Sequence, residues 1–246
     1  MKMIRNQGHG AGKSLTLSLG GETVLDFSFI PAGSFRMGSP VAEEGHEDSE
    51  APQRLVTFSR DFWLSSAPVT AEQWNALMGL PPEAPPDGAQ PRTHVSWEDA
   101  QRFVVRLSAV FPGQSFRLPT EAEWEYACRA GTTGCYSNGE TEADLAQIAW
   151  YAGNSGGTTH PVGMKEKNAW GLYDMHGNVF EWCLDWDGPY PCEEQRDPTG
   201  PPDGTKRILR GGCFKCPPLY CRAANRYSAP PDRRAPNFGF RLAAVP

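Results

Sequence analysis

The last hundred residues of the chain lack the regular spacing of apolar side chains that marks a long helix or strand. Glycine and tryptophan dominate there, as in NAWGLYDMHGNVFEWCLDW at residues 168–186. Glycines at this frequency interrupt both the 3.6-residue period of a helix and the two-residue period of a strand. The pattern predicts short strands joined by long loops. With 26 glycines and 23 prolines in 246 residues, it favours one compact, loop-rich α+β domain.

Helix-start signals stand in the first half of the chain. Thr70 lies three residues before Gln73, and Thr120 three residues before Glu123, the spacing of a capping box. Ser96 precedes a third amphipathic stretch. We therefore expect helices over residues 71–79, 97–111 and 121–130. The apolar stripe of the middle helix consists of Ala100, Phe103, Val104 and Leu107.

Two N-terminal segments suggest ligand sites that simpler interpretations explain better. GHGAGKS at residues 8–14 resembles a phosphate loop, but Gln7 stands where that motif needs glycine. The alternation in residues 15–30 favours a β-hairpin, so residues 1–26 are expected to lead into the domain as strands. AEEGHEDSEAP at residues 42–52 surrounds His46 with acids, and we interpret this run as a solvated loop.

The overall charge limits the classes of partner. The formal net charge is −6, whereas a nucleic-acid-binding domain usually has a basic face, so we expect no nucleic-acid partner. No run approaches the roughly 18 apolar residues of a membrane span, and no secretory signal is visible. We therefore expect no membrane insertion and a cytoplasmic location, where the seven cysteines would be free thiols.

Several motifs occur in a fixed order along the chain. They are FSFIPAGSFRMGSP (27–40), HVSWEDAQRF (94–103), RLPTEAEWEYACRAG (117–131), NAWGLYDMHGNVFEWC (168–183), RILRGG (207–212) and NFGFRLA (237–243). In these motifs the chain resembles the sulfatase-modifying-factor superfamily, the formylglycine-generating enzymes and their relatives. The resemblance implies one irregular domain over residues 27–246, with a formylglycine-generating-enzyme-like variant of the C-type-lectin fold. Five tryptophans would supply buried area in it: Trp124, Trp150, Trp170, Trp182 and Trp186.

The resemblance also implies a calcium loop. Its ligands would be the side chains of Asp174 and Glu181 and the backbone carbonyls of Gly177 and Val179, oxygen donors of the kind that calcium prefers. The alternative is a tight turn capped by Asp174.

Three cysteines lie close together in RGGCFKCPPLYC, residues 210–221. The formylglycine-generating enzymes oxidise a cysteine of a sulfatase and bind copper(I) through two cysteines in a C-x-x-x-Y-C arrangement. Cys216 and Cys221 match that arrangement, which implies a copper-dependent oxidase as one candidate. Against it, Cys221 runs straight into RAANRY without the basic-aromatic stretch of the enzymes, and Pro217-Pro218 replace polar residues.

The loop is more similar to a non-catalytic branch, the variable proteins of diversity-generating retroelements. Their framework motifs CRAANR, PD and GFR are all present here. The resemblance implies a protein that binds an unknown protein or small-molecule ligand through a diversified surface at about residues 210–241. The positions between the framework motifs would contact that ligand: Cys213, Phe214, Lys215, Cys216, Pro217, Pro218, Leu219, Tyr220, Tyr227, Ala229, Arg233, Arg234, Ala235, Pro236 and Phe238.

Two other chemistries of the loop are disfavoured by the sequence. Cys213 and Cys216 form a C-x-x-C pair, but a redox-active pair usually opens a helix, and Pro217-Pro218 follow directly. A structural zinc site needs four ligands, and only three cysteines are close in sequence.

Overall fold

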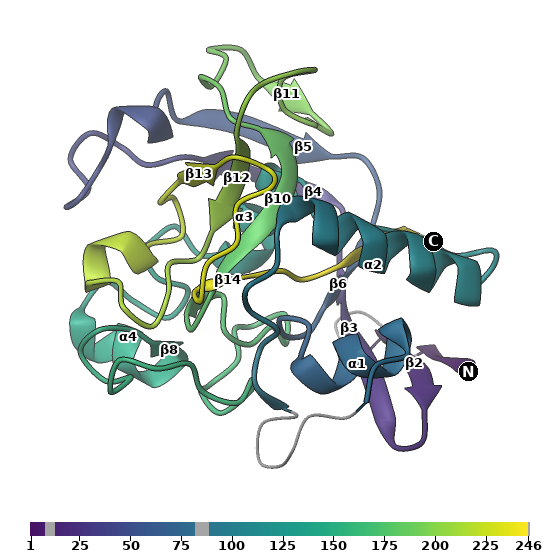
Figure 1. Cartoon of the computed structure of the whole chain (residues 1–246). Helices are drawn as coiled ribbons and strands as arrows, with labels where there is room; N and C mark the ends of the chain where they lie inside the picture. Colours follow the sequence, from purple (N-terminus) through teal and green to yellow (C-terminus); the bar gives the residue numbers. More distant parts are fainter. Residues whose placement is uncertain (8–12, 82–88, 246) are drawn as a thin grey trace.

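The computed structural model describes residues 1–7, 13–81 and 89–245, and Figure 1 shows the course of the chain. Helices and curled sheets are mixed along it, which confirms the α+β class. No helix within these residues is both long and apolar enough to cross a membrane. The helices are α1 (Ala71–Met78), α2 (Trp97–Val110), α3 (Glu121–Arg129) and α4 (Glu142–Ile148), with 3₁₀ turns η2 (Asp48–Glu50) and η4 (Pro218–Cys221).

A six-stranded sheet contains strands from both ends of the chain. Its order is β1-β2-β3-β6-β15-β7, and every pairing in it is antiparallel. β2 and β3 form the predicted hairpin (Figure 1). β15 brings the C-terminal segment between β6 and β7. The strands are β1 (Lys2–Gln7), β2 (Lys13–Gly20), β3 (Thr23–Ile30), β6 (Phe62–Ser65), β15 (Ala243–Val245) and β7 (Ser115–Arg117).

Smaller sheets carry most of the second half of the chain. In the four-stranded sheet β13-β12-β10-β14, β10 pairs antiparallel with β12 and parallel with β14. The other two sheets have the orders β11-β5-β4 and β8-β9. The strands are β4 (Gly33–Met37), β5 (Arg54–Phe58), β8 (Ala149–Trp150), β9 (His176–Gly177), β10 (Phe180–Trp186), β11 (Gln195–Arg196), β12 (Arg207–Arg210), β13 (Tyr227–Ala229) and β14 (Phe238–Gly239).

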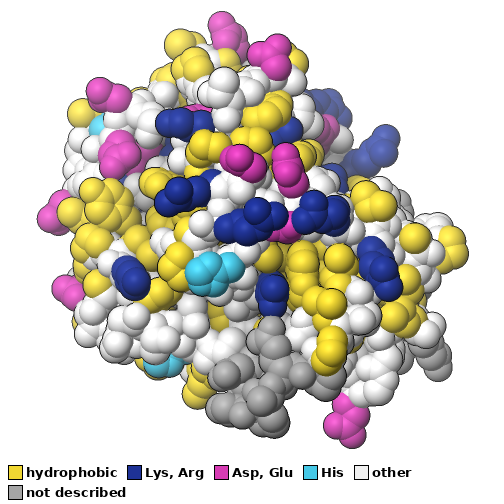
Figure 2. All heavy atoms as spheres, viewed as in Figure 1, with side chains coloured by type: hydrophobic (Ala, Val, Ile, Leu, Met, Phe, Trp, Pro, Cys, Tyr) yellow, Lys and Arg dark blue, Asp and Glu magenta, His cyan; other side chains and the backbone are white. Residues whose placement is uncertain are grey.

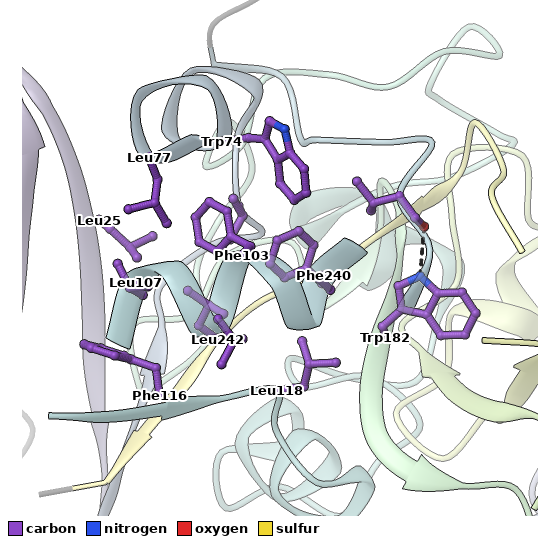
Figure 3. Close-up of a cluster of buried hydrophobic side chains, with 14 of the residues drawn as sticks. Leu25, Trp74, Leu77, Phe103, Leu107, Phe116, Leu118, Trp182, Phe240 and Leu242 are labelled. Atoms are coloured by element: carbon purple, nitrogen blue, oxygen red, sulfur yellow. Dashed lines mark hydrogen bonds between the residues drawn. The ribbon is translucent and has the colours of Figure 1, made fainter. Parts of the chain in front are cut away.

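The main apolar cluster packs α1 and α2 against the sheets (Figure 3). The predicted stripe of α2 is buried in it, and the Trp74 and Phe103 rings stack with centroids 5.4 Å apart. Trp182 is also buried there and donates from its indole nitrogen to the Val95 carbonyl over 3.0 Å. Of the five tryptophans expected inside, Trp124 and Trp182 are fully buried. The expectation was wrong for the other three, which are half-buried: Trp150, Trp170 and Trp186.

The three predicted helices begin at the predicted caps. Thr70, Ser96 and Thr120 each accept a hydrogen bond from the third helical backbone N–H, and that residue's side chain accepts one in return. α4 was not predicted, although Thr141 and Asp144 make the same capping box in the sequence. A helix of seven residues is too short for its apolar spacing to stand out.

The N-terminal segments differ in their outcomes. Residues 8–12 of the phosphate-loop resemblance lie outside the described residues, but a strand and not a helix follows at Lys13. Most of the acidic run is exposed, as expected, but the interpretation was wrong for Glu50. Glu50 is fully buried, because its carboxylate binds the Arg222 guanidinium over 2.6 and 2.8 Å.

Candidate functional site: the cysteine loop and its surroundings

The loop that carries the three cysteines starts at a Gly-Gly pair directly after β12. Gly212 has a φ of 74°, in the left-handed region that glycine adopts easily. A Cβ at this position would lie 2.7 Å from the Tyr220 carbonyl oxygen and 2.8 Å from Cys221 Sγ. The start of the loop is therefore pressed against its own end, and only glycine fits between them.

Cys213 and Cys216 are brought together by a turn. The Cys216 N–H donates to the Cys213 carbonyl over 2.8 Å, and the two sulfur atoms lie 3.0 Å apart. Asn237 Nδ2 donates to Cys213 Sγ over 3.4 Å. The hydrogen bond between the thiols lowers the pKa of Cys213 and raises that of Cys216, because the pair shares one proton.

Cys221 is sealed in the interior and is not exposed at all. It packs in a small cluster with Tyr136, Leu145 and Ile148, against which Cys216 also packs. Burial raises the pKa of the Cys221 thiol, which keeps it protonated. Two thiols suit copper(I). Here, however, the sulfur of half-buried Cys216 is hydrogen-bonded to Cys213, and the sulfur of Cys221 is fully buried. The arrangement thus fits a copper pair of Cys216 and Cys221 only in part.

Buried arginines fix the framework on both sides of the loop. Arg222 binds Glu50 and donates to Glu43 over 2.7 Å, while its second amino group donates to the Gly45 carbonyl. Arg226 binds the Glu121 carboxylate over 2.7 and 3.0 Å. Arg210 donates to Glu125 and to the carbonyls of residues 223–225, so it links the start of the loop to the segment that follows the loop.

The fifteen residues predicted to contact a ligand divide by exposure. Three of the exposed ones are large and apolar: Leu219, Tyr220 and Tyr227 are 41%, 46% and 47% exposed. The other exposed ones are Lys215, Pro217, Arg233, Arg234 and Pro236, and the half-buried ones are Cys216, Pro218 and Ala235. Four are buried in this structure, namely Cys213, Phe214, Ala229 and Phe238, so the exposed part of the predicted surface is formed by the other eleven.

Tyr227 shows how the scaffold supports an exposed side chain. Its ring stacks on Phe180 of β10 with centroids 5.0 Å apart, and Phe238 of β14 lies 6.0 Å from it. The sequence analysis did not identify Phe180, because no neighbouring residue in the sequence indicates that its ring packs under Tyr227. Figure 2 shows apolar groups and a band of Lys and Arg side chains on the face where Figure 1 places the segment between β13 and β14.

The predicted calcium ligands are already engaged by protein groups. Glu181 is fully buried, and its carboxylate accepts from Arg241 over 2.5 and 2.8 Å and from Trp124 over 2.7 Å. Asp174 accepts from the Gly163 N–H over 2.8 Å, and burial raises its pKa to about 6. The side chain of Val179 and the backbone at Gly177 are also buried.

This donor set does not fit calcium, because the Arg241 cation already neutralises the Glu181 carboxylate. No group of three His, Cys, Asp or Glu side chains within the described ranges is placed to hold a metal ion. The turn interpretation of Asp174 agrees better with its contacts, since its φ of 56° is left-handed and its carboxylate holds the neighbouring loop.

Comparisons with known proteins place the chain among its relatives. Residues 20–245 match the model of the sulfatase-modifying factor enzyme 1-like domain. A formylglycine-generating enzyme from Thermomonospora curvata is 33% identical over 88% of this chain and 92% of its own length. A bovine enzyme of the same name is 36% identical over 74% of this chain, which spans 50% of that protein.

Two solved structures share the whole fold. Treponema denticola variable protein 1 superposes with a TM-score of 0.84 at 30% identity, over 95% of this chain and 99% of that one. PvdO from Pseudomonas aeruginosa gives a TM-score of 0.82 at 30% identity, over 94% and 98% of the two chains. Both the predicted fold and the resemblance to a variable protein are thus confirmed. The chain belongs to the sulfatase-modifying factor enzyme 1-like family.

Proposed function

We propose that this protein is a non-catalytic ligand-binding member of its family, which displays a diversified surface from the exposed positions between Lys215 and Pro236. The observation that carries the proposal is the contrast within one loop. Cys221, one of the two sulfurs that an oxidase would need, has no exposed surface, while Leu219 and Tyr220 beside it are 41% and 46% exposed. Exposed aromatic and arginine side chains are the residues that interfaces use most.

The framework supports this function because the backbone of the surface segment is held by framework residues and not by the exposed side chains themselves. Arg210, Arg222 and Arg226 hold the backbone from below through buried carboxylates and carbonyls. The surface side chains between them are free to differ without disturbing those bonds. A preformed loop also loses little conformational entropy when it binds. The likeness to Treponema denticola variable protein 1 agrees with this division of roles.

The retroelement origin can be tested by sequencing the DNA that flanks the gene and the gene itself. We expect a reverse-transcriptase gene nearby and a near-copy of the coding sequence for the C-terminal region that differs at adenines. Amplicons of that region from a growing population should differ at codons of exposed positions such as Tyr220 and Arg233. A locus with neither the reverse transcriptase nor the near-copy would overturn this origin.

A display surface should tolerate substitution at little cost. Replacing Lys215, Tyr220 and Arg233 together by alanine is expected to change the free energy of unfolding by no more than about 1.5 kcal/mol. Their side chains are exposed, and an exposed substitution costs about 0.5 kcal/mol or less. Arg222→Ala, directly after the loop, is the matched control and should cost about 3–5 kcal/mol, since it leaves the buried Glu50 carboxylate without its cation. Equal losses in chemical denaturation would contradict the proposal.

The second candidate is the copper-dependent oxidation of a protein cysteine. It is favoured by the retained C-x-x-x-Y-C spacing and by the 33% identity to a formylglycine-generating enzyme. Copper(I) would be held by Cys216 and Cys221, and its role there would be to activate oxygen.

Titration with copper(I) in the presence of a competing chelator separates the two candidates. For a binding protein we expect no tight one-to-one site that depends on both Cys216 and Cys221. A stoichiometric site that is lost in both Cys216→Ser and Cys221→Ala, but kept in Cys192→Ser, would favour the oxidase. Cys192 is the control because it is exposed and far from the loop in sequence.

A further inference from the structure

We propose that Cys213 and Cys216 form a redox couple that closes to an intrachain disulfide by exchange with a low-molecular-weight disulfide such as oxidised glutathione. The inference goes beyond the proposed ligand binding and does not depend on it. It also differs from the copper candidate, which uses Cys216 with Cys221. The two sulfurs that the structure brings to 3.0 Å are those of Cys213 and Cys216.

The backbone between the two cysteines already has the geometry that a disulfide requires. The hydrogen bond from the Cys216 N–H to the Cys213 carbonyl closes a four-residue turn, in which the end Cα atoms lie less than about 7 Å apart. Disulfides span Cα separations of about 4.4–6.8 Å and have a sulfur–sulfur bond of about 2.0 Å. Bond formation therefore needs a side-chain adjustment of about 1 Å and no rearrangement of the fold.

Redox-active C-x-x-C pairs usually lie at the start of a helix. Here a turn brings the two sulfurs together instead. Gly212, with its left-handed φ, directs the chain into the turn, and Pro217 leaves it with an extended backbone. The next residues form only the short η4, so no helix is needed to bring the sulfurs together. The prolines that disfavoured a redox pair in the sequence thus do not prevent one in the structure.

Accessibility gives the reaction a direction. Cys216 is half-buried and reaches the surface, whereas Cys213 is 1% exposed behind it. Cys128, Cys183 and Cys221 have no exposed surface, so an external disulfide cannot reach them. Cys192 is exposed but has no other cysteine among its neighbours in sequence. Cys135 is half-buried as well, but its thiol donates to the Gly139 and Glu140 carbonyls. Among the cysteines in the described residues, Cys216 is the one that combines access with a hydrogen bond to a second thiol.

The exchange balances without any further reactant. The Cys216 thiol passes its proton to the Cys213 thiolate across the 3.0 Å contact. Cys216 Sγ attacks one sulfur of the external disulfide as this proton leaves and releases one small thiolate, which leaves a mixed disulfide on Cys216. The released thiolate takes the proton of Cys213. Cys213 then attacks Cys216 Sγ and displaces the second small thiolate, which is protonated by water. In sum, two cysteine thiols and one small disulfide give one intrachain disulfide and two small thiols.

Intact-mass spectrometry of the reduced, full-length protein after incubation with oxidised glutathione tests the inference. We expect a species lighter by two hydrogen atoms, two fewer reactive thiols under denaturing conditions than the reduced form of the same chain, and a peptide in which residues 213 and 216 are linked. All measurements use the background Cys135→Ser/Cys192→Ser, because half-buried Cys135 and exposed Cys192 would take up glutathione by themselves.

Two variants make the outcome decisive. In Cys213→Ser the mixed disulfide on Cys216 cannot be displaced, so a stable glutathione adduct should accumulate. Cys221→Ala is the matched control, in which the intrachain disulfide should still form because Cys221 takes no part. A link between residues 216 and 221, or an unreactive Cys216 in the folded protein, would overturn the inference. Neither result would bear on the ligand-binding function, which is tested by the surface substitutions.

Discussion

Arg241→Met is expected to lower the free energy of unfolding by about 3–5 kcal/mol, because it strands a carboxylate in the core. Arg241 and Glu181 are both fully buried, and the guanidinium donates to both carboxylate oxygens, over 2.5 and 2.8 Å. Its remaining donors bind the Ser65 and Tyr173 carbonyls. For a chain of this size the loss corresponds to a fall in Tm of about 10 °C, measured by circular dichroism.

Two comparisons show whether the stranded charge causes this loss. Arg234→Met removes an ion pair to Asp99 in which the arginine side chain is 50% exposed, and such pairs contribute about 1 kcal/mol or less. Adding Glu181→Gln to Arg241→Met should recover part of the lost stability, since the amide is neutral and can still accept from Trp124. Equal effects of the Arg234 and Arg241 substitutions would contradict this account.

The parts of the fold that the sequence predicted are those specified by neighbouring residues. A capping box and an apolar stripe lie within one helix, so Ser96 and the stripe that follows were enough to place α2. The hairpin of β2 and β3 was visible for the same reason, because its alternation and its turn adjoin. The family resemblance supplied the irregular remainder, which has no local period.

The parts that could not be predicted depend on pairs far apart in the chain. Glu50 looked solvated among its acidic neighbours, yet its partner Arg222 lies 172 residues away. Likewise Glu181 resembled a calcium ligand until its contact with Arg241, 60 residues away, was known. A buried charge is stable only with its partner, and a sequence does not show which partner that is.

The same limit applies to the candidate site. The sequence showed three cysteines and could not say which two are in contact, and the motif drew attention to Cys216 and Cys221. The structure instead pairs Cys216 with Cys213 across a turn and buries Cys221. Exposure also divides the predicted surface, because Phe214 and Phe238 have to fill the core beneath the loop.

Gly212→Ala is expected to cost about 2–5 kcal/mol of unfolding free energy from two separate causes. A left-handed φ costs a residue with a Cβ about 1–2 kcal/mol. Crowding adds about 1–3 kcal/mol. The new Cβ would lie 2.7 Å from the Tyr220 carbonyl oxygen and 3.0 Å from the Cys221 Cα, which are backbone atoms that cannot turn aside.

Gly156→Ala separates those two causes. Gly156 also has a left-handed φ, of 64°, but a Cβ there meets nothing within 4 Å, so only the backbone cost of about 1–2 kcal/mol should appear. The difference between the two variants in urea unfolding measures how tightly the ends of the cysteine loop are packed. A difference near zero would mean that the loop yields at Tyr220 and Cys221. In that case residues 213–220 would not be held as a preformed surface, and the low entropic cost argued for ligand binding would be lost.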